Sequence, residues 1–131
     1  MGKKILVVDD EIDICNYLKD ALEYESHTVD VAKTGDEANE KLDQGSFDAV
    51  LIDIRLETQT SGVDVIKKCL ELASHPSVII VSATPERLLK PILEQQGISS
   101  AYETFLEKPS DIKPDVIVRR VNTVLRKRDN L

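Results

Sequence analysis

The 131 residues of this chain are 41% hydrophobic and 31% charged, which is typical of one soluble globular domain that folds without disulfide bonds. The formal net charge of −7 argues against a nucleic-acid binding surface on this domain, because the phosphate backbone selects basic patches. The start of the chain does not resemble a signal peptide and no apolar stretch reaches the roughly 18 residues of a membrane span, so we expect a cytoplasmic protein without membrane contact.

Short apolar runs alternate with segments of helical periodicity along the whole chain. In the first half, we expect a strand over residues 4–8, a helix over about 11–25, a strand over 29–32, a short helix around 38–42 that ends at Gly45, and a strand over 48–53. In the second half, we expect a helix over about 63–73 with Val63, Ile66 and Leu70 on one face, a strand over 78–81, a helix over about 85–96, a strand over 104–106, and a helix that begins at Pro114.

This alternation predicts an α/β fold of the (βα)₅ type, a doubly wound parallel sheet with helices on both faces and right-handed crossovers. We expect one domain over residues 1–131, without internal repeats. The strand over 48–53 places four apolar residues between Asp48 and Asp53, as expected of a strand that is buried on both faces.

Polar side chains follow four of the expected strands. Asp9 and Asp10 follow the first strand, Asp53 ends the third, Ser82 follows the fourth, and Lys108 follows the fifth. In a parallel sheet the carboxyl ends of the strands share one edge, where open α/β sheets bind their ligands. We therefore expect these residues to converge in one crevice.

Asp9 and Asp10 have two readings that the sequence leaves open. An aspartate at this position can cap the following helix, but a cap explains one aspartate better than two. Two unit charges 4 Å apart repel by about 4 kcal/mol at an effective dielectric of 20, and Asp53 adds to the crowding. An oxygen-seeking cation such as Mg²⁺ would offset this repulsion.

Asp53, Ser82 and Lys108 each have an ordinary structural alternative. Asp53 could bond the loop that follows its strand, Ser82 could cap a turn or helix, and Lys108 could be a solvated surface lysine. Beside a metal, however, an aspartate can act as a nucleophile toward phosphorus. A hydroxyl and an ammonium group would then bind the transferred phosphoryl group.

These motifs together resemble the receiver domain of two-component response regulators. The resemblance covers nearly the whole chain and is carried by five segments: Val8-Asp9-Asp10-Glu11, Asp53 at the end of an apolar strand, Gly62 in the next loop, Val81-Ser82-Ala83, and Phe105-Leu106-Glu107-Lys108-Pro109. It implies a flavodoxin-like fold with the strand order 2-1-3-4-5.

The resemblance also implies a role for each site residue. Asp53 would be the phosphoacceptor and Lys108 would bind the phosphoryl group. Asp10 would ligate Mg²⁺ directly, Asp9 would act through water, and the backbone carbonyl of Arg55 would be a further ligand beside Asp53.

Two more residues would form the switch. Ser82 would bind the arriving phosphoryl group, and Phe105 matches the aromatic residue that turns inward when this hydroxyl moves. Phe105 is equally compatible with a plain core position. The Lys108-Pro109 peptide bond is often cis in the family.

Two loops depart from the family pattern. Glu57 stands where a proline is usual, and Gly62 comes one residue late. The segment over 97–103 replaces a familiar Gly-Ala pair. Both loops border the site or the face that many receivers use for output, so the usual partner surface does not transfer directly to this chain. The side chain of Arg55 is expected near the site mouth, where it would change the lifetime of the phosphoryl group.

The resemblance implies a phosphorylation-dependent signalling switch rather than a dedicated enzyme. A histidine kinase or a phosphotransfer protein would donate the phosphoryl group, and a downstream protein or a missing output domain would receive the signal. A second copy of this chain, in a homodimer, is a further expected partner. The basic residues near the end of the last helix offer a partner contact, although a solvated helix face explains them as well. The set is Arg119, Arg120, Arg126, Lys127 and Arg128.

Other functions fit the residues less well. A haloacid-dehalogenase phosphatase needs a second aspartate where Arg55 stands, and a flavin-binding module needs a phosphate loop where Asp9, Asp10 and Glu11 would repel phosphate. A receiver-like scaffold that binds proteins without phosphorylation stays open as the alternative.

The histidines and cysteines do not suggest a metal or redox site. His27 and His75 are expected in solvated loops, away from the strand ends. Cys15 and Cys69 are expected as buried thiols, because each has apolar neighbours in a helix and the sequence lacks the histidine cluster of a zinc site.

Overall fold

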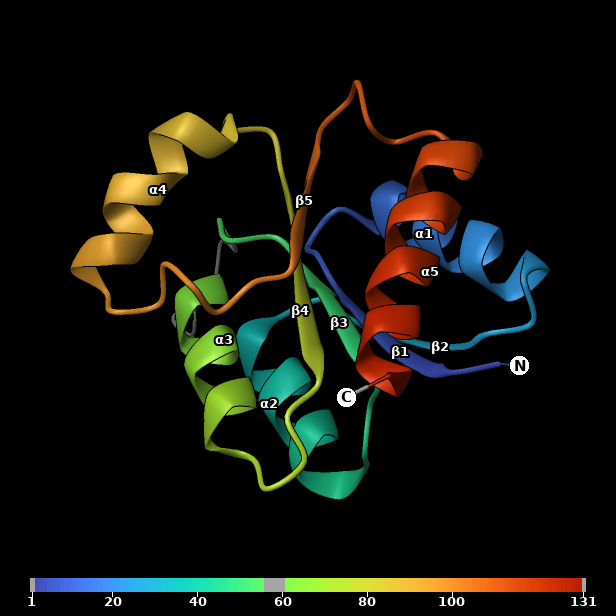
Figure 1. Cartoon of the computed structure of the whole chain (residues 1–131), viewed down its shortest axis with the longest axis horizontal. Coiled ribbons are helices and arrows are strands. Elements are labelled where there is room, and N and C mark those ends of the chain that lie inside the picture. Colours follow the sequence, from blue (N-terminus) through green and yellow to red (C-terminus); the bar gives the residue numbers. More distant parts are fainter. Residues whose placement is uncertain (1, 56–60, 131) are drawn as a thin grey trace.

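The structure is a computed structural model, and it describes residues 2–55 and 61–130. Its centre is a sheet of five strands in the order β2-β1-β3-β4-β5, and every neighbouring pair is parallel. Helices cover both faces, with α1 and α5 on one side and α2, α3 and α4 on the other (Figure 1). The predicted fold class and strand order are confirmed.

The elements follow the expected order with small shifts at their ends. The strands are β1 (Lys4–Val8), β2 (Thr28–Ala32), β3 (Ala49–Ile52), β4 (Ser77–Ser82) and β5 (Thr104–Glu107). The helices are α1 (Ile12–Tyr24), α2 (Gly35–Gln44), α3 (Gly62–Glu71), α4 (Glu86–Gln95) and α5 (Pro114–Asp129). Helix α2 begins earlier than expected, because the Thr34 side chain accepts a hydrogen bond from the Glu37 N–H and caps the helix.

The central strands are apolar because both of their faces are buried. All four residues of β3 are buried, and successive side chains enter opposite cores. Val50 and Ile52 pack toward α2, α3 and α4, while Ala49 and Leu51 pack toward α1 and α5. The strand ends are therefore fixed by packing on both sides, which gives the crevice at the carboxyl edge a rigid base.

Helix α3 buries a face that overlaps the predicted one. Ile66 is buried and Val63 packs against the core, as expected, but Leu70 is 41% exposed and Val65 and Cys69 are buried in its stead. At the start of the helix, a Cβ atom on Gly62 would lie 2.4 Å from the carbonyl oxygen of Asp53. Only glycine permits this close approach.

Helix α4 contains a proline in its interior. Pro91 has no N–H to donate to the carbonyl of Arg87, so this helix lacks one of its own backbone hydrogen bonds. Its first turn is tied to the segment before β5 by a 2.6 Å hydrogen bond from the Tyr102 hydroxyl to Glu86. The inner side of the helix is anchored by Leu89 and Leu93, both fully buried.

The prediction of a solvated loop position is wrong for His27. Its ring is buried, Nδ1 accepts a 3.1 Å hydrogen bond from the Lys3 N–H, and Nε2 lies 2.9 Å from the side-chain oxygen of Asn122. The ring thus joins the start of the sheet to α5. Cys15 and Cys69 are buried free thiols, as expected.

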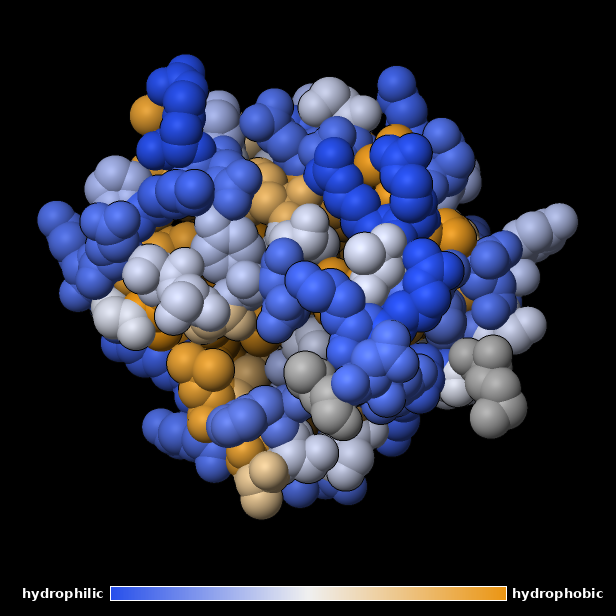
Figure 2. Space-filling view, in the orientation of Figure 1, coloured by the Kyte–Doolittle hydropathy of each residue, from blue (hydrophilic) through white to orange (hydrophobic). Residues whose placement is uncertain are grey.

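The face of the molecule in Figure 2 is mainly hydrophilic, with apolar areas between the hydrophilic side chains. Within residues 2–55 and 61–130, the exposed large apolar side chains are Ile12, Tyr17, Tyr24, Leu70, Leu88 and Ile92. Among the helices described here, none combines the length and the apolar composition that crossing a membrane would require.

Candidate functional site

The carboxyl ends of the strands form one open crevice of about 530 Å³. Strands β1 and β3 are paired in register, Val8 with Ile52, so Asp9 and Asp53 leave the sheet at the same level. The Asp53 N–H donates to the Val8 carbonyl at 3.0 Å, which extends the pairing to the aspartate itself. The register of the sheet thus places the two carboxylates side by side.

Asp9, Asp10 and Asp53 lie together at this edge. One carboxylate oxygen from each falls within 4.8 Å of the other two. Asp9 and Asp53 are buried and Asp10 is half-buried. The sequence prediction that residues far apart in the chain form one acidic cluster is therefore consistent with the geometry.

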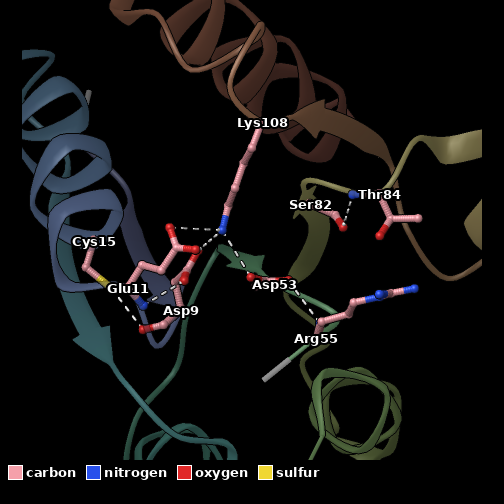
Figure 3. Close-up of polar contacts among 8 residues, drawn as sticks. All are labelled: Asp9, Glu11, Cys15, Asp53, Arg55, Ser82, Thr84 and Lys108. Carbon is pink, nitrogen blue, oxygen red and sulfur yellow. Dashed lines mark hydrogen bonds and ion pairs between the residues drawn. The ribbon is translucent and has the colours of Figure 1, made fainter. Parts of the chain in front are cut away.

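Lys108 reaches into this cluster from the end of β5 (Figure 3). Its Nζ lies 2.7 Å from Asp9 Oδ2, 3.0 Å from Asp53 Oδ2 and 3.9 Å from Glu11 Oε2. The side chain is 8% exposed, so the alternative of a solvated surface lysine is wrong. A single ammonium group balances part of the charge of several carboxylates.

Burial and ion pairing act against each other in the cluster. Burial raises the pKa of Asp9, and the neighbouring Lys108 and the Glu11 N–H offset this only in part. Burial lowers the pKa of Lys108, but its contacts with Asp9 and Asp53 outweigh this effect and leave the pKa raised. Lys108 therefore stays charged, and burial acts against the charged form of Asp9.

The donor set fits a hard divalent cation. Asp9 Oδ2 is buried and has no hydrogen-bond partner, because the nearby Lys108 Nζ approaches it at ion-pair distance without hydrogen-bond geometry. Its other oxygen, Oδ1, accepts the Glu11 N–H at 2.9 Å. Asp9 thus bonds the turn before α1 with one oxygen and faces the Lys108 ammonium group with the other, and carboxylate oxygens are the ligands that Mg²⁺ prefers.

Asp53 uses its two oxygens differently. Oδ1 accepts a 2.9 Å hydrogen bond from the Arg55 N–H, and Oδ2 faces Lys108. The first contact is the loop bond considered from sequence, and it coexists with a place in the cluster. The guanidinium of Arg55 extends away from the Asp53 carboxylate (Figure 3) and lines the crevice.

Ser82 is buried at the end of β4, and its Oγ accepts a 3.1 Å hydrogen bond from the Thr84 N–H. Phe105 is also buried, and its ring meets that of Tyr102 edge-on with centroids 6.5 Å apart. Ser82 therefore lines the crevice in a local turn, and Phe105 sits in the core beneath α4.

Four polar residues that line the crevice were given no role in the site from sequence, namely Glu11, Lys33, Thr34 and Thr84. Glu11 had a usable signal, because it directly follows Asp9 and Asp10. Lys33 and Thr84 carry no signal of their own, since each is an ordinary loop residue next to a strand end. Of the loop with the unusual Glu57, residues 56–60 lie outside the described part of the chain.

Comparisons with known proteins agree with this arrangement. The family model described as response regulator receiver domain matches residues 5–122. The transcriptional regulatory protein ResD of Bacillus subtilis is 33% identical over 124 residues, which cover 95% of this chain and 48% of that protein. CpxR of Escherichia coli K12, also a transcriptional regulatory protein, is 30% identical over 124 residues, which cover 95% of this chain and 50% of CpxR. The chain thus spans about half the length of these relatives.

Solved structures show the same fold. A CheY-like receiver domain protein from Methanospirillum hungatei superposes with a TM-score of 0.84 at 24% identity, over 99% of this chain and 98% of the other. The N-terminal domain of a response regulator/sensory box/GGDEF protein from Carboxydothermus hydrogenoformans gives a TM-score of 0.83 at 26% identity, over 98% of both chains. The fold is therefore shared with proteins of known structure.

Proposed function

Because this chain belongs to the response regulator receiver domain family, we propose that it is switched by transfer of a phosphoryl group to Asp53. Receiver domains of this family are signalling domains of two-component systems. The observation that carries the assignment of Asp53 is its place beside two other aspartates and 3.0 Å from the Lys108 ammonium group. We further propose that residues 1–131 act as one receiver unit in the cytoplasm.

The proposed reaction is an attack by an Asp53 carboxylate oxygen on phosphorus. The phosphorus–nitrogen bond of a phosphohistidine donor breaks as the new phosphorus–oxygen bond forms, and the imidazole leaves with a proton from solvent. Lys108 pairs with the phosphoryl oxygens in place of the Asp53 oxygen it now contacts. Such transfers depend mainly on position and on neutralised charge; Lys108 would supply part of the positive charge and a bound cation the rest.

Asp9, Asp10, Asp53 and the carbonyl of Arg55 would hold Mg²⁺. When bound, this ion supplies positive charge that offsets the crowded carboxylates and the phosphoryl oxygens. The approach of one oxygen from each of Asp9, Asp10 and Asp53 to within 4.8 Å of the others supports this assignment, because a divalent cation offsets such crowded negative charge.

Ser82 and Phe105 form the proposed readout. Ser82 Oγ accepts from the Thr84 N–H, and this bond does not use the hydroxyl proton, which would donate to a phosphoryl oxygen. The negative charge of an acyl phosphate would draw this donor toward it. The readout would then pass to Phe105, which belongs to the same buried cluster as Leu89 and Leu93 of α4.

The proposed phosphodonor is a histidine kinase or a phosphotransfer protein. The proposed recipient of the signal is a downstream protein or an output domain, and dimerisation of the phosphorylated receiver is one way to deliver it. The relatives ResD and CpxR are transcriptional regulators about twice as long as the matched segment, which supports an output domain as the recipient.

The test is phosphorylation by a small donor. The protein is incubated with acetyl phosphate and Mg²⁺, and intact mass is recorded for the wild type, for Asp53→Asn and for Asp48→Asn. We expect one added phosphoryl group on the wild type and on Asp48→Asn, none on Asp53→Asn, and none in excess EDTA. An unmodified wild type under these conditions would instead favour the scaffold alternative.

A further inference from the structure

The basic residues of α5 do not form one solvated face. Arg120 turns toward β5, where its Nη1 donates to the Phe105 carbonyl and pairs with Asp111 Oδ2 at 3.1 Å. Arg128 also makes internal contacts, donating to the carbonyl of His75. Arg119, one residue before Arg120, is exposed. Two neighbouring arginines of one helix thus have different surroundings.

Asp111, which pairs with Arg120, also bonds the backbone of Glu107. Its Oδ2 accepts the Glu107 N–H at 2.9 Å, and its own N–H donates to the Glu107 carbonyl at 2.8 Å. Both backbone groups of Glu107, the residue just before Lys108, are therefore bonded to one residue of the β5–α5 loop. The Arg120 and Asp111 side chains are 34% and 26% exposed, so their contacts are partly shielded from water.

These bonds lie on the outer side of β5, which is an edge strand of the sheet. On its inner side β5 pairs with β4, and the Lys108 N–H donates to the Ser82 carbonyl at 2.8 Å. The backbone leading to Lys108 is thus held from both sides, by β4 within the sheet and by Arg120 and Asp111 outside it. An unpaired edge would leave this backbone free to shift.

We propose that Arg120 and Asp111 are positioning residues for Lys108, fixing the end of β5 so that the ammonium group reaches the Asp53 phosphorylation site. The inference rests on the proposed function, because it concerns how Lys108, a group used in that reaction, is held in place. Neither residue touches Asp53, so both act through the backbone of Phe105 and Glu107. A site that must hold its charged groups to within a fraction of an ångström depends on such support.

The experiment compares Arg120→Met with Arg119→Met, which removes the same charge from the same helix. The rate of phosphorylation by acetyl phosphate is followed by intact mass, and Mg²⁺ affinity is measured by calorimetry. We expect Arg120→Met to slow phosphorylation about tenfold, a typical effect of losing a supporting contact. Arg120→Lys, which keeps a donor, should recover part of the rate, and Arg119→Met should match the wild type.

Two further measurements separate positioning from a general loss of structure. Mg²⁺ affinity should not fall in Arg120→Met, because the metal is held by the carboxylates, whereas a loosened fold would weaken both. In a Lys108→Ala background, Arg120→Met should cause no additional loss of rate. If circular dichroism shows that Arg120→Met does not fold, Asp111→Asn takes its place, with the same expectations.

The outcomes distinguish this inference from the proposed function. Equal rates for Arg120→Met and Arg119→Met, with a phosphorylated wild type, would overturn the positioning role and leave Asp53 as the acceptor. A further loss of phosphorylation rate when Arg120→Met is added to Lys108→Ala would overturn the positioning role as well. An unphosphorylated wild type would instead refute the proposed function itself.

Discussion

Strand β3 has an aspartate at each end, and the two are used in opposite ways. At its amino end, the Asp48 N–H and carbonyl bond Lys4 and Ser77, and Asp48 Oδ2 accepts the Lys4 N–H at 2.9 Å. Its Oδ1 lies 3.9 Å from the Nε of Arg128. Asp48 thus links β1, β4 and α5, and its contacts hold the sheet together.

At the carboxyl end, Asp53 lies among like charges. It shares Lys108 with Asp9, and the two carboxylates together with Asp10 hold more negative charge than that one lysine can balance. The same residue type on the same strand is satisfied at one edge and crowded at the other. The difference teaches that an aspartate at a strand end indicates a chemical site when its neighbours leave it short of positive charge.

The largest expected effect concerns Lys108, the single cation within ion-pair distance of both Asp9 and Asp53 among the described residues. Lys108→Met should slow phosphorylation on the order of 100-fold, the typical loss when one charge-stabilising donor is removed. It should also tighten Mg²⁺ binding, because an ammonium group no longer competes for the carboxylates. Calorimetry with Mg²⁺ and mass-based time courses measure the two effects, and weaker Mg²⁺ binding would contradict the crowding described here.

A smaller effect is expected at the amino edge. Asp48→Ala removes the bond to the Lys4 N–H and should lower the free energy of unfolding by about 1–2 kcal/mol. Phosphorylation of Asp53 should proceed at the wild-type rate. Urea denaturation measures the first quantity and intact mass the second. A large change in phosphorylation with little loss of stability would break the contrast between the two ends of β3.

The smallest effect concerns Cys15, whose thiol donates to the Asp9 carbonyl at 3.1 Å. Burial raises the pKa of Cys15 to about 11 from an ordinary value of 9.0. The folded state therefore favours the neutral thiol, and stability is expected to fall as the pH rises between these two values. At pH 8 a thiol reagent should modify Cys15 only as fast as the protein opens, and rapid labelling of the native protein would show that this side of the crevice is accessible.

Much of the fold and of the site could be predicted from the sequence. The apolar runs of β1, β3 and β4 are buried on both faces, so composition alone identifies them, and parallel pairing then brings Asp9, Asp53 and Lys108 to one edge. The distances within the cluster depend on the register between strands, which no local pattern contains.

Other features could not be predicted because they depend on tertiary contacts. The close approach of Gly62 to the Asp53 carbonyl is a contact between two elements, and His27 is buried by partners far away in the sequence. The contact of Arg120 with Asp111 could not be predicted from the sequence either, because the neighbouring Arg119 is the same residue type and is exposed.

The interior proline of α4 has a consequence for how that helix holds its shape. One backbone hydrogen bond is missing at Pro91. The helix is therefore held more by the burial of Leu89 and Leu93 and by the hydrogen bond from the Tyr102 hydroxyl to Glu86. Phe105 belongs to the same buried cluster as these two leucines. A change in the packing of that cluster would therefore act directly on the position of α4.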